Sequence, residues 1–526
     1  SRRRHTRYSL QSRGLGDVYK RQVEIYMIAQ APDRRLYCYR YNAGTMNYDQ
    51  VFVSNVQVGY SANYDRNSPQ LADFNEDGVA EVYVGNQLFN GLTGVEIVNG
   101  LVSNSQGING GQEALPQAFD VLPTAFCADC SGLELVAGNQ VYSVDIAGGS
   151  MSVEVTYGGT EGDGYTSLAD FDRDGDVDAI IVDGGEVYVW NLQTTAQIGS
   201  TFVIPDMVSP SQPCNASAGN TTVAGRANVA DFDGDGDLEI GVAGRNVYVV
   251  IENNMTQKWQ IASCDGSQKT GSTVFDFEGD GSNEVVYRDE QRLYILDGAT
   301  GAAKAIVVCT SVTRLDYPII SDVNGDGQAE IVSACGGGNG WIEVFNSPTQ
   351  PWVSSRTVWN QHGYHTTNVN DDLRIPQFIQ NHSIVADSLI INNFLVQPTY
   401  LKADGKPAFS APDDSIAINS IDISECQNAD GDGIDTIIVD VTIFNTDSAN
   451  WFIPAGTSVS LYNGDPFTDA GAIYLETVQT LNTLDIGESE NLSIAFTDPE
   501  MIFILFVVVN DNGNGTIPLS VPTTNV

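Results

Sequence analysis

The feature that most constrains the fold is a short acidic segment that recurs five times in the first two thirds of the chain. Each copy has an apolar run, an acidic turn with glycine at its sixth position, and a second run rich in Val and Ile. The turns begin at Asp73, Asp170, Asp231, Asp276 and Asp322, at intervals of 97, 61, 45 and 46 residues. A period of this length with strands in every unit predicts a β-propeller or a solenoid.

Two further repeats lack the complete acidic turn. The widest interval spans about two repeats, and the stretch FCADCSGLELVAGNQVYSVD within it keeps the outgoing strand and Glu134. Cys127 and Cys130 replace the carboxylates there, which predicts a small disulfide in the turn. A redox CxxC pair is the alternative, but that motif begins a helix and this one lies between strands. The other repeat begins at Val23 and matches the second and third strands of a unit, with Glu24 at the last turn position.

Seven repeats between Val23 and about Ser383 predict an all-β fold, a seven-bladed β-propeller over 23–383 with four strands in each blade. Ring closure would hide the edge strands that an open array exposes. We expect 384–412 to be a linker. Alternating strands and turns over 413–526 predict an Ig-like β-sandwich. The segment 1–22 holds seven of the 24 basic residues and one acid, so we interpret it as non-native or disordered.

The acidic turn has the spacing of a calcium loop. Oxygen-bearing side chains at positions one, three, five and nine can surround one ion, and glycine at six lets the carbonyl at seven face it. A solvated turn without an ion is the alternative, but its crowded carboxylates would repel one another. An EF-hand is excluded because β-rich runs flank the turn. About five structural Ca²⁺ sites are expected. The predicted ligands are Asp73, Asn75, Asp77, Glu81; Asp170, Asp172, Asp174, Asp178; Asp231, Asp233, Asp235, Glu239; Asp276, Glu278, Asp280, Glu284; and Asp322, Asn324, Asp326, Glu330.

The charge balance excludes several classes of partner. Acidic residues outnumber basic ones by 67 to 24, for a formal net charge of −43. Nucleic acids and anionic membrane surfaces need clustered Lys and Arg, so neither is expected to bind. The longest apolar run, Met501 to Val509, is too short to cross a bilayer. No membrane span is therefore predicted.

The cysteines indicate an oxidising compartment. Their number, eight, is even, and no zinc-type pair of CxxC motifs occurs. Three local disulfides are proposed, Cys127–Cys130, Cys214–Cys264 and Cys309–Cys335. Disulfides persist outside the cytosol, which predicts an extracellular or cell-surface location. Cys426 has no evident partner in the C-terminal region.

The five turns resemble the FG-GAP, or VCBS-type, repeats of integrin α-subunit propellers and of many bacterial surface proteins. The resemblance covers about two thirds of the chain. It implies structural calcium at the five turns and none at the units of Glu24 and Glu134, which depart from the pattern. The strands after Ser415 resemble the CARDB-type Ig-like domain of cell-surface proteins. Because the propeller family includes adhesins, surface proteins and enzyme scaffolds, the resemblance specifies fold more than function.

Two other segments each leave two interpretations open. The stretch 352–376 is aromatic and contains His362 and His365, and we expect it to pack over a face or the last blade of the propeller. An H-x-x-H metal site completed by Asp371 or Asp372 is the alternative, although a metalloprotease would need an H-E-x-x-H helix and glycine, here Gly363, is unfavourable inside a helix. The sequence NADGDGID at 428–435 echoes the calcium turn, but Thr436 stands at position nine, which favours a plain hairpin.

The expected function is binding rather than catalysis. No G-x-S-x-G, H-E-x-x-H or phosphate-binding loop occurs, so no enzyme activity is predicted. The chain is expected to be a calcium-stabilised extracellular adhesion module of a bacterial surface or secreted protein, with a glycan or a protein as its ligand. A structural spacer in a larger surface protein is one alternative. A polysaccharide lyase or glycosidase on a propeller scaffold is the other.

Overall fold

The structure is a computed structural model that falls into two compact units, Ser1–Val385 with Ile390–Asp404, and Ala386–Leu389 with Gly405–Val526. It describes residues 8–13, 22–30, 32–59, 67–100, 105–110, 113–124, 126–127, 130, 132–205, 207, 220–311, 315–324, 328–336, 341–347, 352–370, 373–379, 392–397, 414–422, 435–445, 453, 455–464, 472–484, 488–498 and 505–509.

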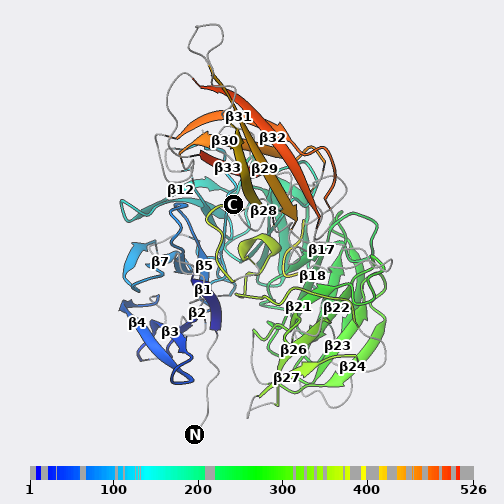
Figure 1. The fold of residues 1–526 in the computed structure, drawn as a ribbon. Coiled ribbons are helices and arrows are strands. Elements are labelled where there is room, and N and C mark those ends of the chain that lie inside the picture. Colours follow the sequence, from blue (N-terminus) through cyan, green and yellow to red (C-terminus); the bar gives the residue numbers. More distant parts are fainter. Residues whose placement is uncertain are drawn as a thin grey trace. The chain divides into compact units, whose positions relative to one another are not determined.

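Unit 1 contains seven antiparallel sheets in its described residues, each made of consecutive strands (Figure 1). Six have four strands and the last has three. The first three sheets are β1 Tyr8–Arg13, β2 Gln22–Ile28, β3 Arg35–Asn42, β4 Asn47–Gln57; β5 Gln70–Ala72, β6 Glu81–Val84, β7 Gln87–Asn90, β8 Glu96–Asn99; and β9 Gln117–Phe119, β10 Glu134–Ala137, β11 Gln140–Asp145, β12 Ser150–Thr156.

The remaining four sheets follow in the same order along the chain. They are β13 Tyr165–Ala169, β14 Asp178–Asp183, β15 Glu186–Asn191, β16 Gln197–Val203; β17 Asn228–Ala230, β18 Glu239–Gly244, β19 Val247–Ile251, β20 Gln257–Ala262; β21 Ser272–Phe275, β22 Glu284–Arg288, β23 Arg292–Asp297, β24 Ala303–Val308; and β25 Ile319–Ser321, β26 Glu330–Cys335, β27 Trp341–Phe345.

Burial explains why these sheets stack as blades. In the sheet of β13–β16 the inner strands β13 and β14 are nearly all buried, whereas the fourth strand, β16, is largely exposed. Apolar side chains of neighbouring sheets share one core, for example Tyr248 of β19 with Val274 of β21 and Tyr287 of β22. Each sheet therefore buries both faces against its neighbours, which is how a propeller forms its core.

The repeat pattern located these sheets correctly. The degenerate repeat near residue 120 is the sheet β9–β12, and the repeat expected from Val23 starts with β2, Gln22–Ile28, the second strand of its sheet. Part of the N-terminal segment forms a strand. Tyr8–Arg13, inside the segment expected to be non-native or disordered, forms β1 and pairs along its length with β2. Because β2 offers an unpaired edge, the preceding chain can complete the sheet without contributing an acidic turn.

The segment after β27 crosses the centre of unit 1, where Figure 1 shows it in yellow-green. Gln361 Oε1 accepts a hydrogen bond from the backbone N–H of Leu71 in β5. Farther on, Val229 of β17 forms a bridge with Phe394. The segment thus contacts the first strands of blades far apart in sequence. The expected packed segment is therefore a central plug rather than a cover for one blade.

Gly363 and Arg226 show how closely the plug fits. A Cβ at Gly363 would lie 2.1 Å from Gln70 Oε1 and 2.8 Å from Arg226 Nη1, so a larger residue here would force these buried side chains to shift. The Arg226 side chain is fully buried, and its Nη2 donates to Gln117 Oε1 at 2.9 Å. Its guanidinium carbon lies 4.6 Å from the centre of the Phe394 ring. Both residues tie the plug to the inner strands.

Two sequence interpretations change at the plug. Residues 392–397, expected to be part of the 384–412 linker, are buried and bound to the inner strands, because Phe394 forms a bridge with β17 and Val396 forms a bridge with β21.

The two histidines of the H-x-x-H sequence face different neighbours. The His362 ring packs edge-on against Tyr317, and the His365 ring packs edge-on against Phe119. Asp371 and Asp372 lie outside the described residues.

Unit 2 has two three-stranded antiparallel sheets in its described residues. Their apolar side chains form one core that joins Val441 of β29 to Leu461 of β30, which makes the unit a β-sandwich. The alternating strands expected over 413–526 are present among the described residues. The sheets are β28 Asp414–Asp422, β29 Asp435–Asn445, β32 Ser489–Asp498; and β31 Ile473–Gln479, β30 Ser458–Asn463, β33 Leu505–Val509. Residues 428–434 of the sequence NADGDGID and Cys426 lie outside the described residues, and Asp435 begins β29.

Two of the predicted disulfides are present, Cys127–Cys130 and Cys309–Cys335. Cys264 is also disulfide-bonded, and its predicted partner Cys214 lies outside the described residues. The helical structure among the described residues is one short 3₁₀ turn, Thr366–Asn368. No helix in the described part of the chain has the length and apolar character needed to cross a membrane.

Candidate metal sites

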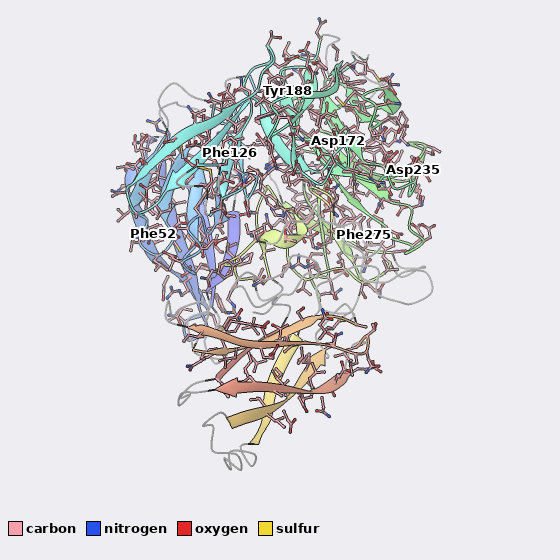
Figure 2. All side chains as sticks on the ribbon, turned by 90° about the horizontal axis from the view of Figure 1, so that it is seen from above. Phe52, Phe126, Asp172, Tyr188, Asp235 and Phe275 are labelled. Carbon is pink, nitrogen blue, oxygen red and sulfur yellow. A yellow bond between two sulfur atoms is a disulfide. The ribbon has the colours of Figure 1, made fainter. Side chains whose placement is uncertain are left out.

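The acidic turns join the first strand of a blade to its second. Each strand pair is antiparallel, so these turns share one face of unit 1, and the connections between successive blades lie on the opposite face. Figure 2 labels Asp172 and Asp235, which belong to the turns of two neighbouring blades. The last turn position begins the second strand, as with Asp178 in β14, Glu239 in β18 and Glu284 in β22.

Three of the five turns bring acidic ligand atoms within 4.8 Å of one another among the described residues. These groups are Asp170, Asp172 and Asp178; Asp231, Asp233 and Glu239; and Asp276, Glu278 and Glu284. Positions one, three and nine of the predicted site therefore converge in each. Position five lies outside these groups. Asp174, Asp235 and Asp280 each accept a hydrogen bond from the backbone N–H two residues later.

In the turn at Asp170, backbone N–H groups hold the carboxylates in place. Phe171 N donates to Asp178 Oδ2 at 2.9 Å, and Gly175 N donates to Asp170 Oδ2 at 3.1 Å. Gly175 has φ = 96°, the left-handed conformation that lets the turn fold back. Each carboxylate is therefore fixed by one oxygen. The other oxygen, Oδ1, remains for a ligand.

Those two second oxygens are the most informative atoms of the site. Asp170 is 5% exposed and Asp178 is fully buried, and their Oδ1 atoms have no hydrogen-bond partner within the described structure. Burial raises the pKa of Asp178 to about 8, and the neighbouring carboxylates add to the rise. Two buried, unpartnered carboxylate oxygens in one cluster are unfavourable unless a proton or a cation joins them.

The turns at Asp231 and Asp276 have the same framework. Phe232 N donates to Glu239 Oε2 at 2.7 Å, and Phe277 N donates to Glu284 Oε2 at 3.0 Å. The pKa of Glu239 rises to about 7 through burial, although Lys258 opposes the rise. Both clusters differ from the cluster at Asp170 in one respect, because a lysine side chain reaches their carboxylates.

The remaining two predicted sites carry asparagine, not an acid, at position three. Asn75 Nδ2 donates to Asp77 Oδ2 at 3.0 Å, so these two predicted ligands bind each other. Burial raises the pKa of Glu81, at position nine of the same turn, to about 8. In the last turn, Asn324 Nδ2 donates to Glu330 Oε1 at 2.8 Å, and Asp326 lies outside the described residues.

The position-nine acids of the two degenerate units have other contacts, although Glu134 Oε1, like the Oδ1 atoms of Asp170 and Asp178, is buried without a hydrogen-bond partner in the described structure. Arg40 pairs with Glu24, which is fully buried. Glu134 accepts hydrogen bonds from Val121 N and Leu122 N, and the Cys127–Cys130 disulfide lies in that turn. Neither unit contributes to the three acidic groups found among the described residues.

The donor set at Asp170 fits a hard divalent cation. Its atoms are carboxylate oxygens, its glycine allows a backbone carbonyl to approach, and its unpartnered oxygens point to a missing positive charge. Calcium accepts six to eight oxygen ligands in flexible geometry. Asp170, Asp172 and Asp178 would hold the ion, whose charge would offset their mutual repulsion.

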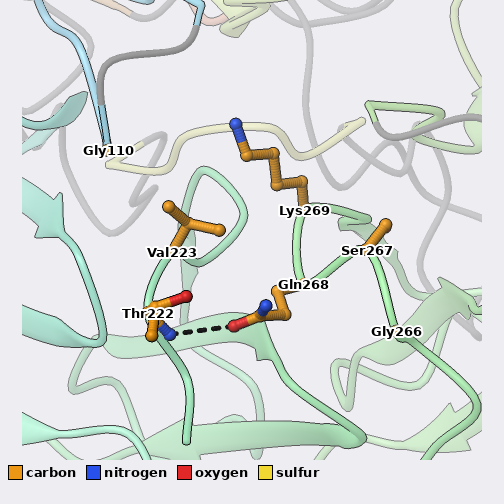
Figure 3. Close-up of a pocket in the computed structure, with 7 residues that line it drawn as sticks. All are labelled: Gly110, Thr222, Val223, Gly266, Ser267, Gln268 and Lys269. Atoms are coloured by element: carbon orange, nitrogen blue, oxygen red, sulfur yellow. Dashed lines mark hydrogen bonds between the residues drawn. The ribbon is translucent and has the colours of Figure 1, made fainter. Parts of the chain in front are cut away.

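The opposite face carries a polar pocket (Figure 3). Connections between successive blades form it through Gly110, Thr222, Val223, Gly266, Ser267, Gln268 and Lys269. Gln268 Oε1 accepts from Thr222 N, which joins two of these connections. Behind the pocket, Lys269 Nζ lies 2.8 Å from Glu113 Oε2 and 3.3 Å from the Tyr165 hydroxyl.

Sequence reasoning did not identify several of these residues. Lys258 and Lys304 occupy the second position of the fourth strand in consecutive blades, a shared signal that could have been read from the repeats. Glu113, Tyr165 and Lys269 lie far apart in the chain and carry no local motif. Their proximity depends on blade order and loop path, which one sequence does not specify.

No protein-family model matches the chain, and no curated protein matches it. Among solved structures, the Vibrio cholerae biofilm matrix protein Bap1 is similar at a TM-score of 0.50 and 14% identity, over 74% of this chain and 84% of that chain. Unit 1 is a β-propeller. BamB from Moraxella catarrhalis has a TM-score of 0.35 at 10% identity, over 63% of this chain and 81% of its own.

Proposed function

We propose that this chain is a calcium-stabilised extracellular binding module of a bacterial surface or secreted protein. The observation that carries the calcium role is the pair of buried, unpartnered oxygens on Asp170 and Asp178. The turn spacing and its resemblance to FG-GAP or VCBS repeats support calcium over other cations. Unit 2 is proposed to be an Ig-like, CARDB-type domain, which its two-sheet architecture supports.

Adhesion is the proposed activity. Its support is a rigid propeller joined to a sandwich, and a fold shared with a protein described as a biofilm matrix component. The disulfides support an extracellular location, because thiols stay reduced in the cytosol. The ligand class is an extracellular glycan or protein.

A binding screen tests adhesion directly. The full chain with calcium is applied to a glycan array and to immobilised matrix proteins, and the hits are repeated in solution with product analysis. Saturable binding without product formation is expected. Turnover of a bound polysaccharide would contradict the binding role, and absence of binding to every surface would favour a structural spacer.

One observation favours a second candidate, a carbohydrate-active enzyme. Lys269, Glu113 and Tyr165 form a cluster of proton-transferring side chains behind the polar pocket. Groups of this kind can serve as acid and base. Degradation of a polysaccharide by the wild type, lost in Lys269→Met but retained in Lys258→Met, would establish this alternative.

A further inference from the structure

An ammonium group of the protein itself contacts the carboxylates of one acidic cluster. Lys258 Nζ lies 2.6 Å from Asp233 Oδ2 and 3.3 Å from Glu239 Oε1, both in the cluster at Asp231. It is also 3.0 Å from Glu252 Oε1 in the turn that joins β19 to β20. Three carboxylates therefore share one cation, and the Lys258 side chain is only 11% exposed.

The next blade repeats the arrangement with Lys304. Its Nζ contacts Glu284 Oε1 and lies 3.4 Å from Glu278 Oε2. Both acids belong to the cluster at Asp276. A lysine thus reaches positions three and nine of the turn in two consecutive blades.

The backbone directs Lys258 toward its cluster. Ile251 pairs with Gln257 and Val250 pairs with Trp259, so Lys258 is the extra residue of a β-bulge. A bulge bends its strand and re-aims the side chain of the extra residue. The position of the ammonium is therefore set by the fold as well as by charge.

Lys304 occupies the same irregularity in its own sheet. Leu296 pairs with Ala303 and Ile295 with Ala305, which leaves Lys304 as the extra residue. The blade of β5–β8 has the same bulge at Ile97, so the bulge belongs to the blade architecture, and in the blades of β17–β20 and β21–β24 it carries a lysine that faces the acidic turn. The position-nine acids they reach, Glu239 and Glu284, are at most 1% exposed.

The blade with the turn at Asp170 provides the contrast. Trp190 pairs with Gln197 and Val189 with Ile198, so no bulge occurs at this point. Among the described residues, no ion pair reaches any acid of the Asp170 cluster. This is also the cluster whose Asp170 and Asp178 keep unpartnered buried oxygens.

We propose that Lys258 and Lys304 are internal counter-ions that compete with calcium for the turns at Asp231 and Asp276. Ammonium and Ca²⁺ repel each other at these distances, so calcium binding requires the lysine to withdraw. The turns at Asp231 and Asp276 then bind calcium more weakly than the turn at Asp170 and remain stable without it. The inference rests on the proposed calcium role.

Lys258→Met and Lys304→Met test this inference, because methionine keeps an unbranched side chain and removes the charge. The chelator-stripped full chain is titrated with calcium by calorimetry, and its melting temperature is measured in calcium and in EDTA. Each variant should bind calcium at one site about tenfold tighter, equal to 1.4 kcal/mol. Its melting temperature should fall in EDTA and match the wild type in saturating calcium.

Arg35→Met is the matched control, because it removes one positive charge and the Arg35–Asp33 ion pair outside the acidic turns. It should leave the calcium titration unchanged. Wild-type affinity in both lysine variants, with equal loss of stability in calcium and in EDTA, would reduce the lysines to structural ion pairs and overturn the inference. If the wild type bound no calcium while the lysine variants did, the proposed calcium role would fail and the counter-ion inference would stand.

Discussion

At the scale of single residues, the two aspartates of the turn at Asp170 carry the calcium assignment. Each uses one carboxylate oxygen to hold a backbone N–H and keeps the other buried without a partner. These hydrogen bonds hold both carboxylates in place before an ion binds, so ion binding costs little conformational entropy. Position three, Asp172, is more exposed and contributes mainly charge.

Asp178→Asn should remove most of the calcium-dependent stabilisation of this turn. The amide keeps the side-chain shape and one oxygen, but it loses the charge that attracts the ion. Where calcium exceeds its dissociation constant 100-fold, a bound ion contributes about 2.7 kcal/mol to the free energy of unfolding. Chemical denaturation with and without calcium measures the loss. Equal calcium stabilisation in this variant and the wild type would exclude Asp178 as a ligand.

Calcium binding should weaken as the pH falls from 8 to 6. Burial and neighbouring charges raise the pKa of Asp178 to about 8 in the ion-free protein, so this carboxyl is largely protonated below that pH. Calcium must displace the proton, and lower pH therefore favours the ion-free form. Calorimetry in two buffers of different ionisation enthalpy should detect proton release. Affinity that is independent of pH across this range would contradict the assignment.

At the scale of structural elements, the plug fastens the inner strands of several blades to one segment. Gly363 is its closest point of approach, because the Gln70 and Gln117 side chains and Arg226 surround it. The inner strands β9 and β13 supply hydrogen-bond acceptors for the buried Arg226. The Nε of Arg226 donates to the Thr166 carbonyl at 2.7 Å, and its Nη2 donates to Gln117.

Gly363→Ala should lower the free energy of unfolding by about 1–3 kcal/mol, because the added methyl group overpacks the centre of the propeller. Gly44→Ala is the control, since a Cβ there meets only the Asn42 side chain at 3.3 Å. Denaturant titration of both variants in calcium compares them. A Gly363→Ala variant as stable as Gly44→Ala would show that the plug is looser than described.

The Cys309–Cys335 disulfide joins the end of β24 to β26 and so links the last two blades. Its removal in the double variant Cys309→Ser, Cys335→Ser should cost about 3 kcal/mol, because the bond restricts the unfolded chain across 26 residues. Thermal melting of the variant without reductant measures the loss. An unchanged melting temperature would mean that the three-stranded blade is held by packing alone.

At the scale of the whole molecule, the sequence predicted the blades well and the centre poorly. The acidic turns recur at fixed places between a first and a second strand, so local pattern was sufficient to locate the sheets, including the one without acids near Glu134. The plug has no repeat. Its residues, such as Phe394, acquire their role only when distant strands surround them, which no local pattern encodes.

The candidate sites were predictable to a similar degree. Spacing alone identified positions one, three and nine, which converge in three turns. Spacing did not show that Lys258 and Lys304 reach two of the clusters, because a β-bulge in the fourth strand directs them there. The sequence predicted the same kind of site in every turn, but the turns that begin at Asp231 and Asp276 differ from the turn that begins at Asp170 because a lysine contacts their carboxylates.

The central claim is that calcium holds this propeller together, and one measurement addresses it most directly. The melting temperature of the full chain is recorded at fixed ionic strength in EDTA and at increasing free calcium. The melting temperature is predicted to rise with calcium concentration, because an ion that binds only the folded state must stabilise it. A melting temperature that is identical in EDTA and in excess calcium would contradict the claim.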